Sequence, residues 1–329
     1  MFCRNIIAPL LLRAFCHITL VLCPAVFLLL SEPSRAADTV AVLLSERGGH
    51  YSEYFEALSR SLGEASPSAR PLLVVELPPG RERPDEAALA GVNVIVAVGV
   101  QAMRAVAAWE NTPPVLNVLV PRASYDKLLA ETGRARHRGQ FSAIYLDQPL
   151  ARQLNLIQQV LPGKRRISVL LGPDSAFFLP RLRAAVTRSG MEIFSEEVSS
   201  EPQIIPALSR LLNAGDILLA IPDSIVFTRD TARSVLLTTY RHQKPLIGFS
   251  QGYVNAGALA AVFSTPAQIA QQSAELLRSL PPGRTVLPAP RYPAFFSVAV
   301  NRSVARALAL DIPTDASLQS NLSRMPEGE

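Results

Sequence analysis

Short apolar runs alternate with amphipathic stretches along the chain from residue 39 onward. Most of the apolar runs are continuous rather than alternating, which is typical of parallel strands covered by helices on both faces. They predict nine strands, at residues 39–44, 72–77, 92–98, 115–120, 167–171, 217–221, 246–249, 258–263 and 296–300.

The stretches between these runs have helical periodicity. In one of them Leu150, Leu154 and Ile157 fall on a single helical face. Together they predict eight helices, at residues 53–62, 101–109, 150–160, 176–189, 204–213, 231–242, 267–280 and 303–310. Repeated alternation of strand and helix predicts an α/β fold. Nine strands in a chain of this length favour two Rossmann-like lobes with parallel sheets over one very wide sheet.

The first 36 residues have the pattern of a secretory signal peptide. Arg4 and Arg13 give a positive start, and residues 14–30 form an uncharged apolar run. This run is short for a membrane anchor and contains Pro24. We therefore expect cleavage after Ala36 and a periplasmic mature protein.

All three cysteines, Cys3, Cys16 and Cys23, lie in this leader. Leu22 precedes Cys23 where a lipidated cysteine needs a small residue, so we do not expect a lipoprotein. The mature chain then has no cysteine, which excludes a disulfide-stapled scaffold and a cysteine zinc site.

Composition and charge narrow the function classes further. A chain that is 49% hydrophobic and 18% charged has enough apolar residues for packed cores, which argues against disorder. The net charge is +5, and the basic run at residues 134–138 lies between two glycines, as in a solvated loop. No basic stripe is interleaved with aromatic residues, so nucleic acid is not an expected partner.

Polar residues follow several of the predicted strands. Ligands of open α/β sheets bind at the carboxyl ends of the strands, and two such lobes would place a cleft between them. In the first half these positions give Glu46 and Tyr51, and then the run Gly99, Val100 and Gln101. Backbone amides at a helix start near Gly99 are suited to hold a carboxylate, and Tyr51 offers a ring for stacking.

The second half offers a similar set of strand-end residues, namely Ser175, Asp223, Ser250, Gln251 and Tyr253. Asp223 is the candidate partner for a ligand ammonium, because a carboxylate is a charged group that only accepts. Helix capping is the alternative for the serines, and lobe packing is the alternative for both tyrosines.

Residues 248–252 fit the G-x-S-x-G motif of serine hydrolases, with Ser250 as the nucleophile. In that fold the catalytic histidine follows the serine, whereas all four histidines here precede Ser250. Residues 253–257 also predict a poor helix. The histidines have no metal-ligand spacing, and no phosphate-binding glycine motif is present. We therefore expect no enzyme activity, no metal and no cofactor.

Four segments share motifs with one known family. They are residues 153–170 with Leu161-Pro162-Gly163, residues 222–226, residues 245–260, and residues 301–313 with Asn301, Ala305, Leu308, Leu310, Ile312 and Pro313. In these motifs the chain resembles ABC-transporter substrate-binding proteins of the tryptophan/tyrosine-binding type, which have a type I periplasmic-binding fold.

The resemblance implies two lobes joined by a three-crossover hinge. Residues 37–146 and 258–284 would form lobe 1, residues 147–257 and 285–315 lobe 2, and residues 316–329 a flexible tail. It also implies a monomer that captures a small solute and delivers it to an ABC permease of the inner membrane. Asp223 would then meet the amine of the ligand, and residues 99–101 its carboxylate.

Three loops depart from the family pattern. Gly99-Val100 replaces Gly-Thr, Val120-Pro121-Arg122 replaces a segment with Asp-Pro, and Ser264-Thr265-Pro266 replaces Asp-Tyr-Tyr. Arg122 is suited to a bidentate contact with an anionic ligand. The resemblance implies an amino acid or a related solute as the ligand, and Arg122 points to an acidic or anionic ligand instead. The alternative is a periplasmic sensor or accessory protein that binds a partner protein; a serine hydrolase is less favoured than either.

Overall fold

The structure is a computed structural model that describes residues 38–63, 72–76, 89–110, 112–133, 139–281 and 286–327. The expected leader, its three cysteines and the basic run at 134–138 lie outside these residues. None of the described helices combines the length and the apolar character needed to cross a membrane.

Sheet A forms the first lobe and is entirely parallel. Its strands are ordered β2-β1-β3-β4-β5. They are β1 (Asp38–Leu44), β2 (Leu72–Glu76), β3 (Val92–Val98), β4 (Val115–Val120) and β5 (Phe141–Tyr145).

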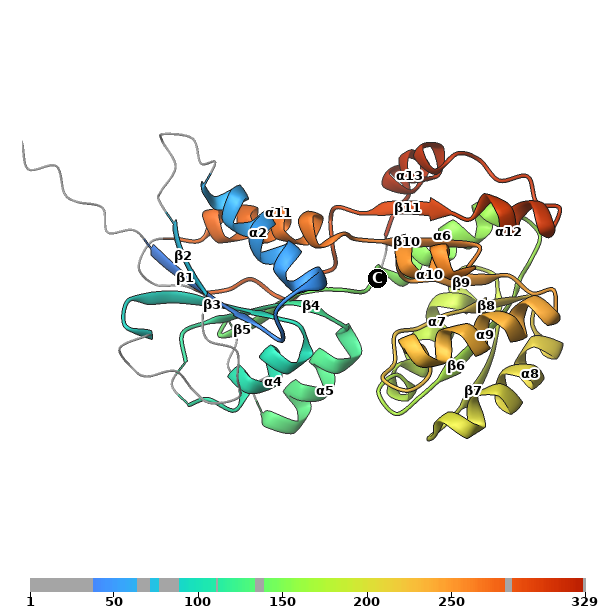
Figure 1. The fold of residues 1–329 in the computed structure, drawn as a ribbon, viewed down its shortest axis with the longest axis horizontal. Helices are drawn as coiled ribbons and strands as arrows, with labels where there is room; N and C mark the ends of the chain where they lie inside the picture. The colour runs from blue at the N-terminus through green and yellow to red at the C-terminus, as the bar shows by residue number, and fades with distance from the viewer. Residues whose placement is uncertain are drawn as a thin grey trace, which may run out of the picture. The chain divides into compact units, whose positions relative to one another are not determined.

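Helices cover both faces of sheet A (Figure 1). On one face, α2 (Gly49–Gly63) and α11 (Pro266–Ser279) bury Leu58 and Ile269 in a single apolar cluster. On the other face, α4 (Val100–Ala107) and α5 (Arg122–Thr132) bury Met103 and Tyr125 in a second cluster. This double cover explains why the central strands are continuous apolar runs.

Sheet B forms the second lobe, with strand order β11-β10-β9-β8-β6-β7. All its strands are parallel except β11, which pairs antiparallel with β10. They are β6 (Arg166–Leu171), β7 (Glu192–Glu197), β8 (Ile217–Leu219), β9 (Leu246–Gly248), β10 (Ala260–Phe263) and β11 (Ser297–Val300).

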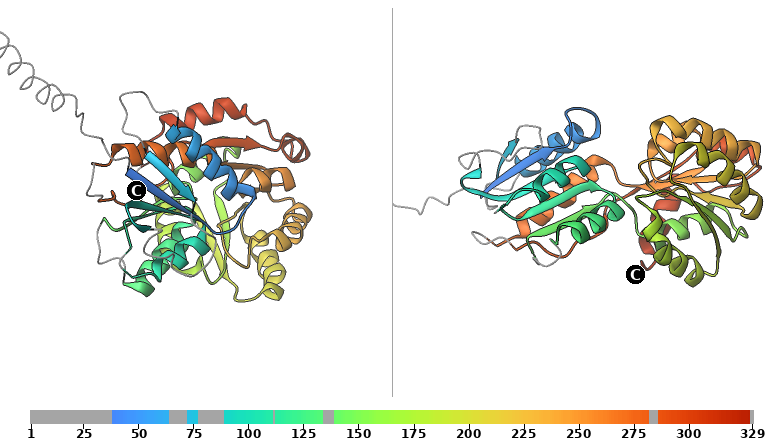
Figure 2. Two further views of the ribbon diagram at one scale, coloured as in Figure 1. Left: turned by 60° about the vertical axis from the view of Figure 1, so that its left-hand side comes forward. Right: turned by 90° about the horizontal axis from the view of Figure 1, so that it is seen from below.

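Sheet B is also covered on both faces (Figure 2). One apolar cluster joins it to α6 (Leu150–Val160), α7 (Leu179–Arg188), α12 (Arg302–Ala307) and α13 (Asp315–Arg324). Another joins its opposite face to α8 (Ile204–Ala214), α9 (Arg229–Arg241) and α10 (Gln251–Ala256). Two short 3₁₀ helices, η2 (Ala176–Phe178) and η3 (Glu201–Gln203), precede α7 and α8.

The two lobes repeat one strand order. If β6 to β10 are counted within their own lobe, both sheets read 2-1-3-4-5, and sheet B adds the antiparallel β11. The prediction of an α/β fold with two Rossmann-like lobes is confirmed. The order reverses between β1 and β3 in sheet A, and between β6 and β8 in sheet B, which is where doubly wound sheets bind ligands.

Several elements differ from the sequence prediction. The strands β5 and β7 and the helices α5, α10 and α13 were not predicted. β7 has the sequence EIFSEE and is half-exposed at the edge of its sheet, so it lacks a continuous apolar run. The prediction of poor helix after Ser250 is wrong, because the Ser250 hydroxyl caps α10 by accepting from the Tyr253 amide.

The lobe boundaries also differ in detail from the predicted ones. β10 pairs with β9 in sheet B, whereas the predicted boundary placed residues 258–284 together in lobe 1. Residues 286–292 run beside β5, where Arg291 exchanges backbone hydrogen bonds with Ala143 and Tyr145. Residues 316–324 belong to α13, in which Leu318 and Leu322 are buried, rather than to a flexible tail.

The chain crosses between the two sheets three times, after β5, after β10 and before β11. One serine hydroxyl links all three crossings. Ser264 Oγ accepts from Gln148 Nε2 at 2.9 Å and donates to the Phe295 carbonyl at 2.6 Å. The predicted three-crossover connection is therefore present and internally hydrogen-bonded.

A buried arginine strengthens the same region. Arg152 is 3% exposed, and its guanidinium donates to Gln148 Oε1 at 2.5 Å and to the Pro293 carbonyl at 3.1 Å. Glu327 supplies a carboxylate oxygen 2.5 Å from Arg152 Nε. The guanidinium also lies 4.1 Å from the centre of the Phe296 ring. A buried charge needs such partners to offset its lost hydration.

Asp147, at the first crossing, makes stability depend on pH. Burial raises the pKa of its carboxyl group from 3.8 to about 6, although the Arg122 amide donates to it. Between these pH values the folded chain binds more protons than the unfolded chain, so the free energy of unfolding falls as the pH rises.

We expect Asp147→Asn to gain about 1–3 kcal/mol of stability relative to wild type between pH 4 and pH 7.5. The asparagine keeps an oxygen for the Arg122 amide but has no charge to bury. Urea unfolding at the two pH values measures the gain, with Asp311→Asn at an exposed carboxyl group as the control. A difference from wild type that does not change with pH would contradict this role of Asp147.

Candidate functional site

The candidate site residues gather where the strand order reverses in each sheet. Glu46 and Tyr51 follow β1, and residues 99–101 follow β3. In sheet B, Ser175 follows β6 and Asp223 follows β8. Each lobe therefore presents one polar loop cluster at the edge where open α/β sheets take their ligands.

The cluster of lobe 1 depends on a close approach to Gly99. This residue has φ +88°, and a Cβ atom there would lie 2.6 Å from Cε1 of Tyr51 and 2.5 Å from Oγ of Ser45. Ser45 in turn donates its amide to the Val98 carbonyl and accepts from the Ala102 amide at 3.0 Å. The loop after β1 is thus fixed to the start of α4, with the Tyr51 ring against Gly99.

Glu46 belongs to the same cluster, because its carboxylate acts on the Tyr51 hydroxyl. Burial raises the pKa of the Tyr51 hydroxyl, and the nearby carboxylate of Glu46 raises it further. Glu46 and Gln101 are exposed, and Val100 is half-buried. The amides of Val100 and Gln101 belong to the first turn of α4, whose N–H groups have no partner within the helix. The structure therefore brings together five of the six lobe 1 residues that the sequence singled out, all except Arg122.

The cluster of lobe 2 is organised by Asp223. Its Oδ2 accepts from Ser175 Oγ at 2.8 Å and from the Asp174 amide at 3.2 Å. Its Oδ1 accepts from the amides of Ile225 at 2.9 Å and Val226 at 3.3 Å. The side chain thereby joins the loop after β6 to the loop after β8.

These four hydrogen bonds bear on the role predicted for Asp223. A carboxylate has about four lone-pair sites, and groups of its own lobe already occupy that number. Ser175 is fully buried, and its hydroxyl also accepts from the Gly172 amide at 3.0 Å. The structure shows Asp223 and Ser175 positioning two loops; their contact with a ligand stays a prediction.

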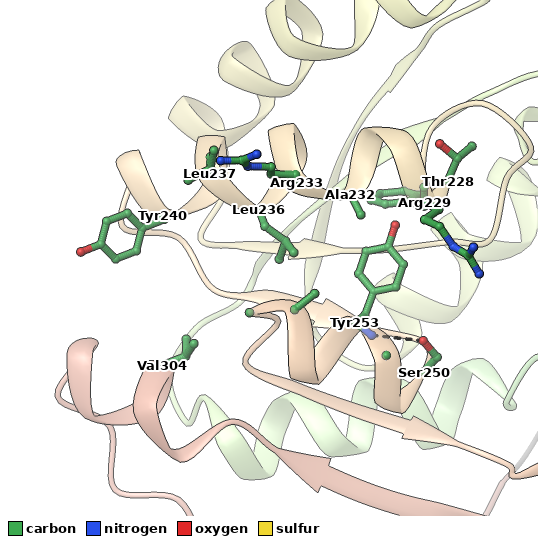
Figure 3. A pocket seen from close by; sticks show the side chains of 14 residues that line it. Thr228, Arg229, Ala232, Arg233, Leu236, Leu237, Tyr240, Ser250, Tyr253 and Val304 are labelled. Carbon is green, nitrogen blue, oxygen red and sulfur yellow. Dashed lines mark hydrogen bonds between the residues drawn. The ribbon is translucent and has the colours of Figure 1, made fainter.

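The residues after β9 form a third group. Ser250 caps α10, Gln251 is exposed and donates to Asn255, and Tyr253 is buried. The Tyr253 ring packs against Phe249 at 4.8 Å and Phe227 at 6.3 Å between ring centres. Ser250 and Tyr253 line a hollow between helices of lobe 2, which Figure 3 shows.

Arg122 lies apart from these three groups. Its guanidinium lies 5.4 Å from the centre of the Tyr145 ring and 5.2 Å from that of Tyr292. It also donates to the Tyr292 hydroxyl at 2.7 Å and lies 3.4 Å from Asp126. These contacts commit much of the guanidinium to packing beside β5; its predicted role toward an anionic ligand stays a prediction.

The hydrolase motif has ordinary backbone geometry. Ser250 has φ −155° and ψ 159°, an extended conformation, whereas a nucleophile elbow is a strained turn. Its hydroxyl accepts a hydrogen bond as a helix cap. Within the described part of the chain, no three histidine, aspartate or glutamate side chains gather to hold a metal ion.

Sequence reasoning did not assign roles to Ser45, Gly172 or Tyr292. A Cβ atom on Gly172 would lie 2.2 Å from Oδ1 of Asp223, so the lobe 2 cluster requires glycine there. Both Ser45 and Gly172 directly follow strands, and this position is the sequence feature that could have identified them as site residues. Tyr292 contacts Arg122 across 170 positions of sequence and carries no local signal.

Solved structures with the same fold are known at low sequence identity. One is described as an ABC domain in complex with L-Trp from Streptococcus pneumonia, with 14% identity and a TM-score of 0.59 over 87% of this chain and 98% of that one. A conserved domain protein from Vibrio cholerae has 16% identity and a TM-score of 0.58, covering 86% and 98%. A ligand-free, open substrate-binding protein with adhesive properties from Clostridium difficile has 13% identity and a TM-score of 0.62, covering 85% and 97%.

No protein-family model and no curated protein sequence matches the chain. At identities this low, the similarity to solved structures establishes the fold. The chain has the two-lobed fold of type I periplasmic-binding proteins, as its resemblance to substrate-binding proteins of ABC transporters implied.

We expect Gly99→Ala to destabilise the protein by about 1–3 kcal/mol, because alanine at this positive φ is strained and its methyl group displaces the Tyr51 ring. Urea unfolding measures the loss. Gly63→Ala is the matched control, since its Cβ would meet no atom within 4 Å. Equal stability of the two variants would show that the approach of Tyr51 to Gly99 is not needed.

Proposed function

We propose that the protein is a periplasmic solute-binding protein that captures a small molecule between its lobes for an ABC importer. The observation that carries the proposal is the pair of polar loop clusters, one at the strand-order reversal of each sheet. Both clusters are held by hydrogen bonds within their own lobe, so they exist before a ligand arrives. Such preorganisation lowers the cost of binding.

The proposed ligand is an amino acid or a related solute. The first-turn amides of α4 are suited to a carboxylate, and the Tyr51 ring offers an apolar face beside them. Glu46, which is exposed next to Tyr51, supplies a carboxylate for an ammonium. Asp223 then contributes chiefly by holding the loops after β6 and β8 in place, with a direct contact to the amine as an additional role.

The proposed mechanism is capture followed by closure about the three crossings, with no bond chemistry. The leader would direct the chain to the periplasm, where it would act as a monomer and deliver its solute to an inner-membrane permease. The L-Trp complex reported for the Streptococcus protein is in keeping with a small amino-acid ligand.

A thermal-shift screen against amino acids, dipeptides and organic acids tests this proposal. We expect at least one compound to raise the Tm, since a ligand at one hundred times its Kd adds about 2.7 kcal/mol to the stability of the folded state. Titration calorimetry then gives the Kd of that compound. If no compound in the panel raises the Tm, the transport function is contradicted.

The roles of the two clusters are tested with that compound. We expect Asp223→Ala and Gly172→Ala each to weaken its affinity about tenfold or more, because both disturb the loops after β6 and β8. Glu46→Gln should lower the affinity for a ligand that carries an amine. It should leave the affinity for a ligand without an amine unchanged. Asp311→Asn, at an exposed carboxyl group, is the control. Unchanged affinity in Asp223→Ala would show that this residue does not contribute to binding the compound.

A further inference from the structure

Helix α9 has one face that combines arginines with exposed apolar side chains. Its buried residues, among them Val235, hold the opposite side of the helix against lobe 2. On the outward side, each residue lies three or four positions from the next, so that all share one face. These exposed residues, which we call the α9 face, are Arg229, Arg233, Leu237, Tyr240 and Arg241.

The apolar part of the α9 face is open to solvent. Leu237 is 45% exposed and Tyr240 is 74% exposed. They lie one turn apart, and no other described helix carries two exposed large apolar side chains. Burial of such a leucine side chain is favourable, and tyrosine, with an apolar ring and a polar tip, suits a membrane–water interface. Both side chains are therefore placed to enter an apolar layer beside the helix.

The α9 face is positively charged. Arg229, Arg233 and Arg241 make no ion pair and no side-chain hydrogen bond with the described part of the chain. Asp230 is the only acidic residue of α9, and it lies in the first turn, where the helix dipole favours a carboxylate. The neighbouring helices α8, α10 and α12 have no acidic residue. The three guanidinium groups are thus available to an anionic partner outside the chain.

The spacing of the arginines indicates the shape of that partner. From Arg229 to Arg241 the helix rises about 18 Å. Figure 3 shows the guanidinium of Arg229 at one end of the hollow beside α9, and that of Arg233 at the other, beside Leu237. One compact anion cannot contact all three groups, whereas a layer of phosphate groups can. An anionic bilayer offers such a layer with an apolar interior directly behind it.

We propose that the α9 face docks the protein on an anionic membrane surface. The three arginines pair with lipid phosphates, and Leu237 and Tyr240 enter between the headgroups. The attachment is reversible, because each arginine near an anionic bilayer raises the affinity only about fivefold. The sequence predicts a chain without a lipid anchor, so this face would keep the protein near an inner-membrane permease. This surface is additional to the proposed solute site.

Cosedimentation with vesicles tests the proposal. The chain from residue 37 onward is used, because the apolar run of the leader would itself bind lipid; it contains every described strand and helix and the apolar cores of both lobes. We expect binding to vesicles of equal parts phosphatidylglycerol and phosphatidylcholine to be at least tenfold stronger than to phosphatidylcholine alone, and to weaken in about 0.3 M salt. No binding to the anionic vesicles, or equal binding to both, would overturn the proposal.

Charge variants locate the contact. We expect Arg233→Gln and Arg241→Gln each to weaken binding to the anionic vesicles about three- to fivefold. Arg183→Gln is the matched control, because Arg183 is exposed on α7, which covers the opposite face of sheet B. Losses of equal size in all three variants would indicate a general charge effect and contradict the α9 face as the contact.

Apolar variants test the insertion of side chains. We expect Leu237→Ser and Tyr240→Ser each to weaken vesicle binding about threefold or more, with little change in Tm because both positions are exposed. Phe177→Ser is the matched control, since Phe177 is 47% exposed and lies just before α7. A loss in Phe177→Ser as large as that in Leu237→Ser would contradict insertion at α9.

The position of the contact can be measured directly, because the expected mature chain has no cysteine. An environment-sensitive fluorophore on Tyr240→Cys should shift its emission to the blue with anionic vesicles, and one on Phe177→Cys should not; the reverse result would overturn the proposal. A stable dimer in sedimentation velocity that Tyr240→Ser dissociates would assign the α9 face to a second copy and also overturn it. All these measurements are made without a solute, so a failure here is distinguishable from a failure of solute binding.

Discussion

The three segments that connect the lobes depend on one side chain. A serine hydroxyl has a single hydrogen to donate, and Ser264 directs it to the Phe295 carbonyl while accepting from Gln148. Loss of this hydroxyl leaves two polar groups without their partner in a buried place, which costs more than the bond itself gains. Arg152 extends the same network to the Pro293 carbonyl and to Glu327. These contacts fix where the chain leaves one sheet and enters the other.

In each lobe a glycine leaves room for a side chain from a neighbouring loop, but the two side chains differ in chemistry. In lobe 1, Gly99 admits the ring of Tyr51; in lobe 2, Gly172 admits the carboxylate of Asp223. Each glycine directly follows a strand beside the reversal of strand order. A side chain at either position would displace the group that organises the loop. The shape of each cluster is thus set by a missing Cβ atom as much as by the polar groups that surround it.

Continuous burial made much of the fold predictable from sequence. The strands at 92–98 and 115–120 and the helix at 150–160 coincide with the prediction, because their apolar runs or stripes face well-covered cores. β7 was missed because an edge strand with polar residues lacks that signal. The candidate site residues could be located at strand ends, but the partners of Asp223 could not. Its bond to Ser175 spans 48 positions, and only the folded sheet brings these loops together.

The position of α11 in the chain has a consequence for the order of folding. This helix covers α2 and completes one face of sheet A, yet it follows five strands of sheet B in sequence. During synthesis from the N-terminus, the apolar side of α2 around Leu58 and Leu62 therefore stays uncovered until Ser279 has emerged. Lobe 1 is thus completed only after most of lobe 2 has been made, and lobe 2 itself still awaits β11, α12 and α13.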